Sequence, residues 1–123
     1  MGIRVAVYGS LRQGMGNHRL LESSKFLGKD KLDGFIMYSL GGFPCIRTVF
    51  PEGNTITVEV YEVDDETFRR LDILEGYPSF YDRKKVDTQY GEAWIYTIER
   101  EKSRPVVESG DWVLFRTGVY NAL

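Results

Sequence analysis

The amino-acid sequence predicts an α+β fold, a small mixed and mostly antiparallel β-barrel with one principal helix and short flanking helices. Six to eight short apolar runs are joined by short connections, which favours antiparallel pairing. Only residues 64–76 carry a full set of helix signals. The first strand reaches its neighbours through a short helix, which indicates a mixed sheet closing toward a barrel. The length of 123 residues predicts a single domain over residues 1–123.

Composition and charge exclude several classes of protein. Apolar residues make up 42% and charged residues 28%, which is typical of a folded chain with a packed core. The net charge of −2 gives no basic excess for binding nucleic acid. No apolar run approaches the ~20 residues of a membrane span, and no signal-peptide pattern opens the chain. The single cysteine, Cys45, forms no internal disulfide. These features predict a cytoplasmic protein without nucleic-acid or membrane partners.

The turn that follows the first predicted strand is a candidate anion-binding site. Residues 5–8 (Val-Ala-Val-Tyr) have high β-propensity, and Gly9-Ser10 then breaks the strand. Because glycine allows backbone angles that other residues avoid, successive N–H groups there can face one point. A concavity of N–H donors attracts a carboxylate, a phosphate or an oxyanion. The alternative is an ordinary turn at the end of a strand.

The middle of the chain reads as a short helix followed by strands. Asn17 is a candidate N-cap for a helix through Ser23. Residues 55–63 alternate apolar and polar side chains over nine positions and give the clearest half-buried strand. The other elements expected here are a strand over 26–38 interrupted at Gly28 and Gly34, a strand beginning at 43–46, and a turn over 51–54.

The principal helix is predicted to begin after Asp64 and to end at Glu75. Asp64 is a natural N-cap, and two acidic residues follow it at the positive end of the helix dipole. Gly76 is a C-cap, and Pro78 prevents continuation. Glu75 therefore occupies the last helical position, where a carboxylate is unfavourable because the dipole is negative there.

The last third of the chain is predicted to be extended. A hairpin joins residues 81–88 to 92–98 through Gln89-Tyr90-Gly91. A charged loop follows over 99–104. The apolar runs 106–107 and 112–115 are expected to form two final extended segments.

Glu75 is the candidate for acid–base chemistry. Its sequence neighbours are mostly apolar or aromatic, and partial burial among them raises a carboxyl pKa toward neutrality. A carboxylate in that state can take a proton and return it within one catalytic cycle. The alternative is a solvent-facing glutamate at a helix end with no role.

Other chemistry has little support in the sequence. The single His18 and the single Cys45 form no metal-ligand cluster, so no metal is expected. His18 is expected on a helix surface, and Cys45 is expected to be a small buried side chain without a base partner. The glycines after residue 8 match neither phosphate-binding fingerprint, which argues against nucleotide binding. Arg83 lies in a charged strand segment and could turn inward toward a carboxylate. The pair Trp94 and Trp112, with Tyr96, is expected in the core or in a pocket wall.

Taken together and in order, six motifs resemble the gamma-glutamylcyclotransferase-like family, in its gamma-glutamylamine cyclotransferase and avirulence-induced-gene branch. The resemblance runs from residue 5 to about residue 112. The motifs are Tyr8-Gly9-Ser10-Leu11-Arg12, Leu32-x-Gly34-Phe35, Gly42-Phe43-Pro44, Leu71-Asp72-x-Leu74-Glu75-Gly76-Tyr77-Pro78, Tyr81-x-Arg83 and Ala93-x-x-Tyr96.

This resemblance implies a mixed β-barrel enzyme that releases 5-oxoproline from a gamma-glutamyl amine or peptide without a metal or cofactor. By motif match, Tyr8, Gly9, Ser10 and Leu11 would bind the substrate, and Glu75 would be the general acid/base. One departure stands out: the family commonly has glycine before the glutamate of its central strand, whereas Val58 precedes Glu59 here. If that glycine makes room for substrate, the pocket here is narrower or different.

The proton transfers that formation of 5-oxoproline requires agree with the presence of Glu75 and of the Gly9-Ser10 turn. The substrate α-amine must lose a proton before it attacks its own γ-carbonyl, and one carboxylate can carry that proton to the leaving amine. The Gly9-Ser10 turn would hold either the α-carboxylate or the oxyanion. The alternative function is a non-catalytic binding or accessory protein that retains the pocket for an acidic small ligand. The expected partner is a small gamma-glutamyl compound, and no pattern specifies an oligomeric state.

Overall fold

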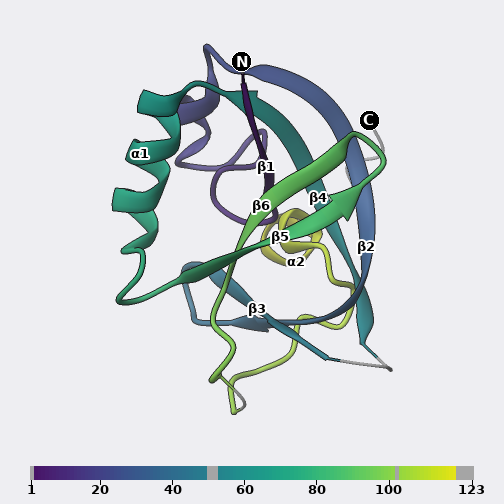
Figure 1. Cartoon of the computed structure of the whole chain (residues 1–123). Helices are drawn as coiled ribbons and strands as arrows, with labels where there is room; N and C mark the ends of the chain where they lie inside the picture. The colour runs from purple at the N-terminus through teal and green to yellow at the C-terminus, as the bar shows by residue number, and fades with distance from the viewer. Residues whose placement is uncertain (1, 50–52, 102, 119–123) are drawn as a thin grey trace.

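The computed structural model describes residues 2–49, 53–101 and 103–118, which form one curled mixed sheet with two α-helices and a 3-10 helix (Figure 1). The sheet order is β3-β2-β4-β1-β6-β5. Its strands are β1 (Ile3–Val7), β2 (Lys25–Ser39), β3 (Pro44–Thr48), β4 (Asn54–Val63), β5 (Asp82–Thr88) and β6 (Gly91–Thr97). This half-barrel confirms the fold class predicted from the sequence.

β1 lies inside the sheet rather than at an edge. It pairs antiparallel with β4, where Val5 lies opposite Tyr61, and parallel with β6, where Val5 lies opposite Trp94. The pairings of β2 with β3, of β2 with β4 and of β5 with β6 are antiparallel. The turn that follows β1 is therefore held from both sides by neighbouring strands.

The sheet curls because its longest strand is bent and its two edges approach each other. β2 shifts register against β4 near Gly28 and Gly34, the two positions where the sequence predicts interruptions. Directly after β6, the Ile98 N–H donates to the carbonyl of Ile46 in β3 at 3.0 Å. These contacts turn an open sheet into a half-barrel.

Helix α1 (Asp65–Glu75) has the caps that the sequence predicts. The Asp64 carboxylate accepts a hydrogen bond from the Thr67 N–H at 2.7 Å, and Gly76 ends the helix in the left-handed region at φ 66°. Leu71 is fully buried against the sheet. The helix is thereby fixed at both ends, with Glu75 in its last turn.

The segment Trp112–Phe115 was predicted to be extended, and this prediction is wrong. It begins helix α2 (Trp112–Thr117), whose N-cap Asp111 accepts from the Leu114 N–H at 3.1 Å and whose C-cap is Gly118 at φ 70°. Two good caps outweigh the β-propensity of the run between them. The fully buried Trp112 ring packs in the interior core, and Figure 1 shows α2 within the curl of the sheet. The nearby Val106 is extended as predicted, since it forms a bridge with Tyr38.

Alternate side chains of β1 enter two different cores. Ala6 and Tyr8 belong to the core inside the curl, whereas Val5 and Val7 belong to the core on the other face, which also contains Leu71 of α1. The end of β1 therefore lies between two packed layers, which holds the following turn in place.

The turn predicted over residues 51–54 lies partly outside the described residues, which resume at Gly53. None of the helices in the described ranges combines the length and the apolar character needed to cross a membrane.

Candidate active site

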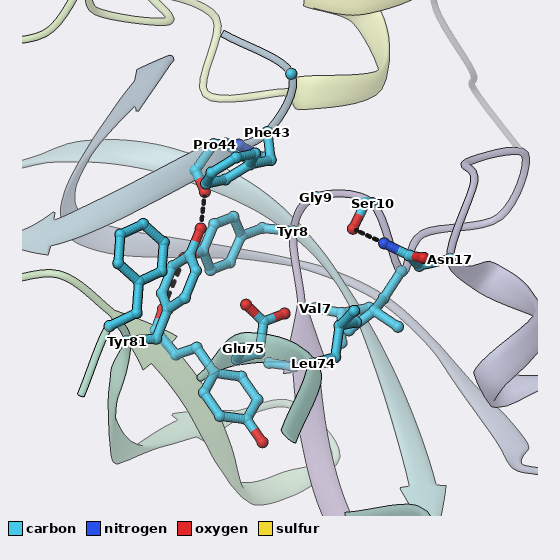
Figure 2. A pocket seen from close by; sticks show the side chains of 15 residues that line it. Val7, Tyr8, Gly9, Ser10, Asn17, Phe43, Pro44, Leu74, Glu75 and Tyr81 are labelled. Carbon is cyan, nitrogen blue, oxygen red and sulfur yellow. Dashed lines mark hydrogen bonds between the residues drawn. The ribbon is translucent and has the colours of Figure 1, made fainter. Parts of the chain in front are cut away.

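A pocket of about 250 Å³ lies where β1 ends (Figure 2). Its walls come from residues 6–11, 42–44, 74–75 and 80–81, together with Asn17 and Tyr96. The five residues singled out from the sequence all line it: Tyr8, Gly9, Ser10, Leu11 and Glu75. Segments separated by more than sixty positions in the sequence thus meet in one cavity.

The turn after β1 presents N–H groups that no other part of the described chain uses. The Gly9 carbonyl accepts from the Arg12 N–H at 3.0 Å, and the Ser10 carbonyl accepts from the Asn17 N–H at 2.9 Å. Within the described residues, the N–H groups of Gly9, Ser10 and Leu11 have no acceptor. Three consecutive donors beside a pocket form an attractive environment for an anion.

Asn17 serves this turn and does not cap a helix as predicted. The 3-10 helix η1 (His18–Leu21) follows it, but the Asn17 side chain makes no capping bond. Instead its amide donates to the Ser10 hydroxyl oxygen at 2.9 Å, as Figure 2 shows. The side chain is used inside the pocket, where it fixes the Ser10 rotamer.

Gly9 is required by space rather than by an unusual backbone angle. Its φ is not positive, so the conformational argument made from the sequence does not apply. A Cβ at this position would instead lie 2.7 Å from Cγ and 2.8 Å from Cδ of Pro44, which is too close. The β1 turn and the start of β3 thus approach each other as closely as glycine permits.

A buried group of charges anchors the chain directly after the turn. Arg12 and Glu59 are fully buried, and Asp111 is 6% exposed. The Arg12 guanidinium donates to Glu59 at 2.9 Å and to Asp111 at 2.7 Å. Glu59 also accepts from the Gln13 N–H and from the Tyr61 hydroxyl, both at 2.9 Å. The turn is therefore tied to β4 and to the start of α2.

This arrangement keeps Glu59, the glutamate that follows Val58 in the central strand, away from the pocket. Glu59 faces Arg12 and lies outside the pocket lining, so its carboxylate holds the fold. Val58, which replaces the glycine of the family pattern, points into the interior core and also lies outside the lining. Val58 therefore does not narrow the pocket.

Glu75 lies across the pocket from the β1 turn. It is half-buried at the end of α1, and Figure 2 shows its carboxylate pointing into the pocket toward Tyr8. Burial raises the pKa of Glu75 from 4.5 to about 7, which agrees with the expectation from its apolar neighbours. The carboxyl group can therefore exchange a proton near neutral pH.

The tyrosines around Glu75 remain neutral donors. Tyr8 donates to the Tyr96 carbonyl at 2.7 Å, Tyr81 donates to the Pro44 carbonyl, and Tyr96 donates to Asp72 at 2.7 Å. Burial raises the pKa of each of these phenols above its ordinary value. Among the described residues that line the pocket, Glu75 is the only one with a carboxyl side chain.

Comparison with known proteins identifies the family. The profile described as "Gamma-glutamyl cyclotransferase, AIG2-like" matches residues 5–114. The chain belongs to this family. The Escherichia coli K12 protein YtfP, named a gamma-glutamylcyclotransferase family protein, is 37% identical over 112 residues, which cover 90% of this chain and 96% of YtfP.

Two solved structures have the same fold as this chain. The uncharacterised protein PH0828 from Pyrococcus horikoshii superimposes with a TM-score of 0.82 at 34% identity, covering 94% of each chain. An aig2-like protein from Mus musculus superimposes with a TM-score of 0.77 at 25% identity, covering 87% of this chain and 86% of that one. The half-barrel is therefore the fold of this family.

In this family member, a second charged group supports the last turn of α1. Arg83 turns inward, as the sequence suggested, and donates to Asp72 at 3.0 Å. Its guanidinium lies 4.1 Å from the ring centre of Tyr77 and 4.4 Å from that of Trp94. Asp72 also accepts from Tyr96, so one carboxylate joins α1, β5 and β6 three residues before Glu75.

Cys45 and His18 lie outside the pocket lining. Burial raises the pKa of the Cys45 thiol to about 12, consistent with an inert, fully buried side chain. The His18 ring is partly buried, and its Nδ1 bonds the Leu11 carbonyl at 2.9 Å, so it is not a free surface group. The described ranges hold no cluster of three or more His, Cys, Asp or Glu side chains placed to bind a metal.

Proposed function

We propose that the protein is a cyclotransferase that releases 5-oxoproline from a gamma-glutamyl amine or gamma-glutamyl peptide. The observation that carries this proposal is the position of Glu75. Glu75, whose pKa is raised to about 7, lines the same small-molecule-sized pocket as Gly9, Ser10 and Leu11, whose N–H groups have no acceptor among the described residues. In this proposal Glu75 moves the proton, and the N–H groups of the β1 turn bind negative charge.

The reaction begins with proton transfer to Glu75. The substrate α-ammonium cannot attack, so the Glu75 carboxylate removes one proton and leaves a neutral amine. That amine attacks the γ-carbonyl carbon of the same molecule and forms the new C–N bond of a five-membered ring. Because the attack is intramolecular, holding the glutamyl chain folded supplies much of the rate.

The N–H groups of the Gly9-Ser10-Leu11 turn stabilise negative charge during this step. They hold the α-carboxylate of the substrate or the oxyanion of the tetrahedral intermediate, and both are anions of suitable size for such a turn. Arg12 and Asn17 fix the turn beforehand, so the donors need no rearrangement when charge develops.

The reaction ends with protonation of the leaving amine. Protonated Glu75 donates to that nitrogen, and the bond from the γ-carbonyl carbon to the leaving nitrogen breaks. Glu75 then takes the second proton from the ring nitrogen, and the released amine receives it. Over the whole reaction two protons pass from the α-nitrogen to the leaving amine, and Glu75 returns to the carboxylate.

The test is an assay of 5-oxoproline release from a panel of gamma-glutamyl amino acids, amines and peptides. We expect turnover of at least one member. Titration with 5-oxoproline provides an independent readout, in which the Gly9, Ser10 and Leu11 amide resonances shift. Binding at the turn without turnover of any panel member would support the accessory-protein function instead. Absence of both would contradict a gamma-glutamyl site.

The pH dependence of the reaction follows from the raised pKa. Because the carboxylate is the base, kcat/KM is expected to fall about ten-fold per pH unit below pH 7 and to level off above it. The measurement is kcat/KM from pH 5 to pH 8 on one active substrate. A profile that stays flat down to pH 5 would show that no group with this pKa is the base.

A further inference from the structure

One wall of the pocket is a row of four aromatic rings. The ring centres of Phe43 and Phe80 are 6.1 Å apart, those of Phe80 and Tyr81 are 5.2 Å apart, and those of Tyr81 and Tyr96 are 6.5 Å apart. The interplanar angles lie between 69° and 89°, so each ring meets its neighbour edge to face. We call these four residues the aromatic row.

The row runs from the buried part of the pocket to solvent. Tyr81 and Tyr96 are buried, whereas Phe43 is 39% exposed and Phe80 is 42% exposed. Two phenylalanines in contact at the mouth of a pocket leave a continuous apolar surface in water. Such a surface is typical of a ligand-binding site, because a ligand that covers it removes apolar area from solvent.

The polar and apolar parts of the pocket are separated. The hydroxyls of Tyr81 and Tyr96 already donate to Pro44 and Asp72, so the row has no free hydroxyl proton to offer. The described residues that line the pocket include no lysine or arginine. The charged end of a ligand therefore belongs at the β1 turn and Glu75, and its apolar end belongs against the aromatic row.

The size of the pocket decides which part of a gamma-glutamyl compound meets Phe43 and Phe80. The volume of about 250 Å³ is below the range of about 300–1,000 Å³ that drug-sized ligands occupy. The glutamyl group fills the part between the β1 turn and Glu75. The leaving amine must start within reach of Glu75 and extend to the mouth, where Phe80 stands five positions after Glu75 in the chain.

We propose that Phe43 and Phe80 form a subsite for the leaving amine and select gamma-glutamyl amides of apolar amines, aromatic amines above all. This proposal rests on the proposed function and specifies its substrate class. An aromatic ring in the leaving amine can pack edge to face against Phe43 or Phe80, as these two rings pack against each other. A small leaving amine such as methylamine reaches neither phenylalanine and gains nothing from them.

The experiment compares two substrates on each protein, gamma-glutamyl benzylamide and gamma-glutamyl methylamide. For the wild type, kcat/KM for the benzylamide is expected to exceed that for the methylamide by about 10-fold or more. In the Phe43→Ala/Phe80→Ala variant, this ratio is expected to fall by about 10-fold. The ratio is independent of the folded fraction, because both substrates are measured on the same preparation. If the double variant does not fold, the same ratio is measured on the single variants Phe43→Ala and Phe80→Ala.

Phe26→Ala is the matched control. Phe26 is 42% exposed like Phe80, but it packs on Tyr61 and lies outside the pocket lining. The substrate ratio of this variant is expected to equal that of the wild type. A wild-type ratio near one, or an equal fall in the Phe26→Ala variant, would overturn the subsite.

A binding measurement distinguishes failure of the subsite from failure of the proposed function. If the wild type turns over neither amide, the two affinities are compared by calorimetry on the wild type and on the double variant. Tighter binding of the benzylamide that is lost in the double variant would support the subsite without catalysis. Equal binding of both amides, or no binding, would refute it.

Discussion

Replacing Glu75 with Gln is expected to slow release of 5-oxoproline by roughly 10²–10⁴-fold, the usual contribution of one general acid/base. The amide has nearly the same shape as the carboxyl group but cannot accept the proton of the substrate ammonium. Substrate binding at the β1 turn is expected to persist, because the N–H donors of Gly9, Ser10 and Leu11 are unaffected. The measurements are single-turnover release of 5-oxoproline and calorimetric binding of 5-oxoproline.

The same substitution is expected to stabilise the fold above neutral pH. Burial raises the pKa of Glu75 from 4.5 to about 7, so the folded state holds this proton more tightly than the unfolded chain. The stability that the folded state gains from this tighter proton binding is fully present below pH 4.5 and is lost as the pH rises through 7. At pH 8 the wild type carries a buried charge that Gln lacks, a difference of about 1–3 kcal/mol in the free energy of unfolding.

Glu66→Gln is the control for both effects. Glu66 lies on the same helix with a side chain that is 61% exposed and forms surface ion pairs with Arg69 and Arg70. Activity and the pH dependence of stability are expected to stay close to those of the wild type. Glu59→Gln is unsuitable, since it disturbs the buried ion pair. Comparable turnover by wild type and Glu75→Gln would show that another group moves the proton.

Replacing Arg12 with Met is expected to lower the free energy of unfolding by about 3–5 kcal/mol, the cost of removing one partner from a buried ion pair. Glu59 and Asp111 would then remain in the interior without a counter-charge. Arg12→Lys is expected to recover only part of this loss, because an ammonium cannot reproduce the fork that contacts both carboxylates. Chemical unfolding at pH 7 measures both variants.

A surface arginine provides the comparison for Arg12. Arg70 pairs with Glu66 on α1, and both side chains are 61% exposed, so Arg70→Met is expected to cost less than about 1 kcal/mol. In the Arg12→Met/Glu59→Gln double variant, the loss is expected to be smaller than the sum of the two single losses. Additive losses would show that the two groups are not coupled as their 2.9 Å contact indicates.

Local signals were sufficient for the parts of the fold that depend on neighbours in the sequence. The caps of α1 at Asp64 and Gly76 are complete within a short segment, so the position of Glu75 could be predicted from it. The same type of signal was present for α2 in Asp111 and Gly118. It was missed because the run Trp112–Phe115 consists of residues that favour strands.

The features that could not be predicted from the sequence depend on contacts between distant segments. Nothing beside Gly9 in the sequence indicates that Pro44 packs against it. In the same way, only the folded chain shows that Glu59 meets Arg12 rather than the pocket. The order of the motifs predicted the pocket residues. The contacts among the buried charges of Arg12, Glu59 and Asp111, which hold the turn in place, could not be predicted from the spacing of residues.

The bond between Arg12 and Asp111 joins residues 99 positions apart, and this separation has a consequence for synthesis of the protein. A ribosome makes the β1 turn long before Asp111, which helps to anchor it. Until Asp111 has been made, Arg12 lacks its second carboxylate, and the Tyr8 hydroxyl likewise has no acceptor until Tyr96, 88 positions further on, has been made. Closing such distant pairs is slow and cooperative. The nascent chain is thus expected to gain its binding pocket in one step after Asp111 has been made, so shorter nascent chains hold no ligand-competent turn.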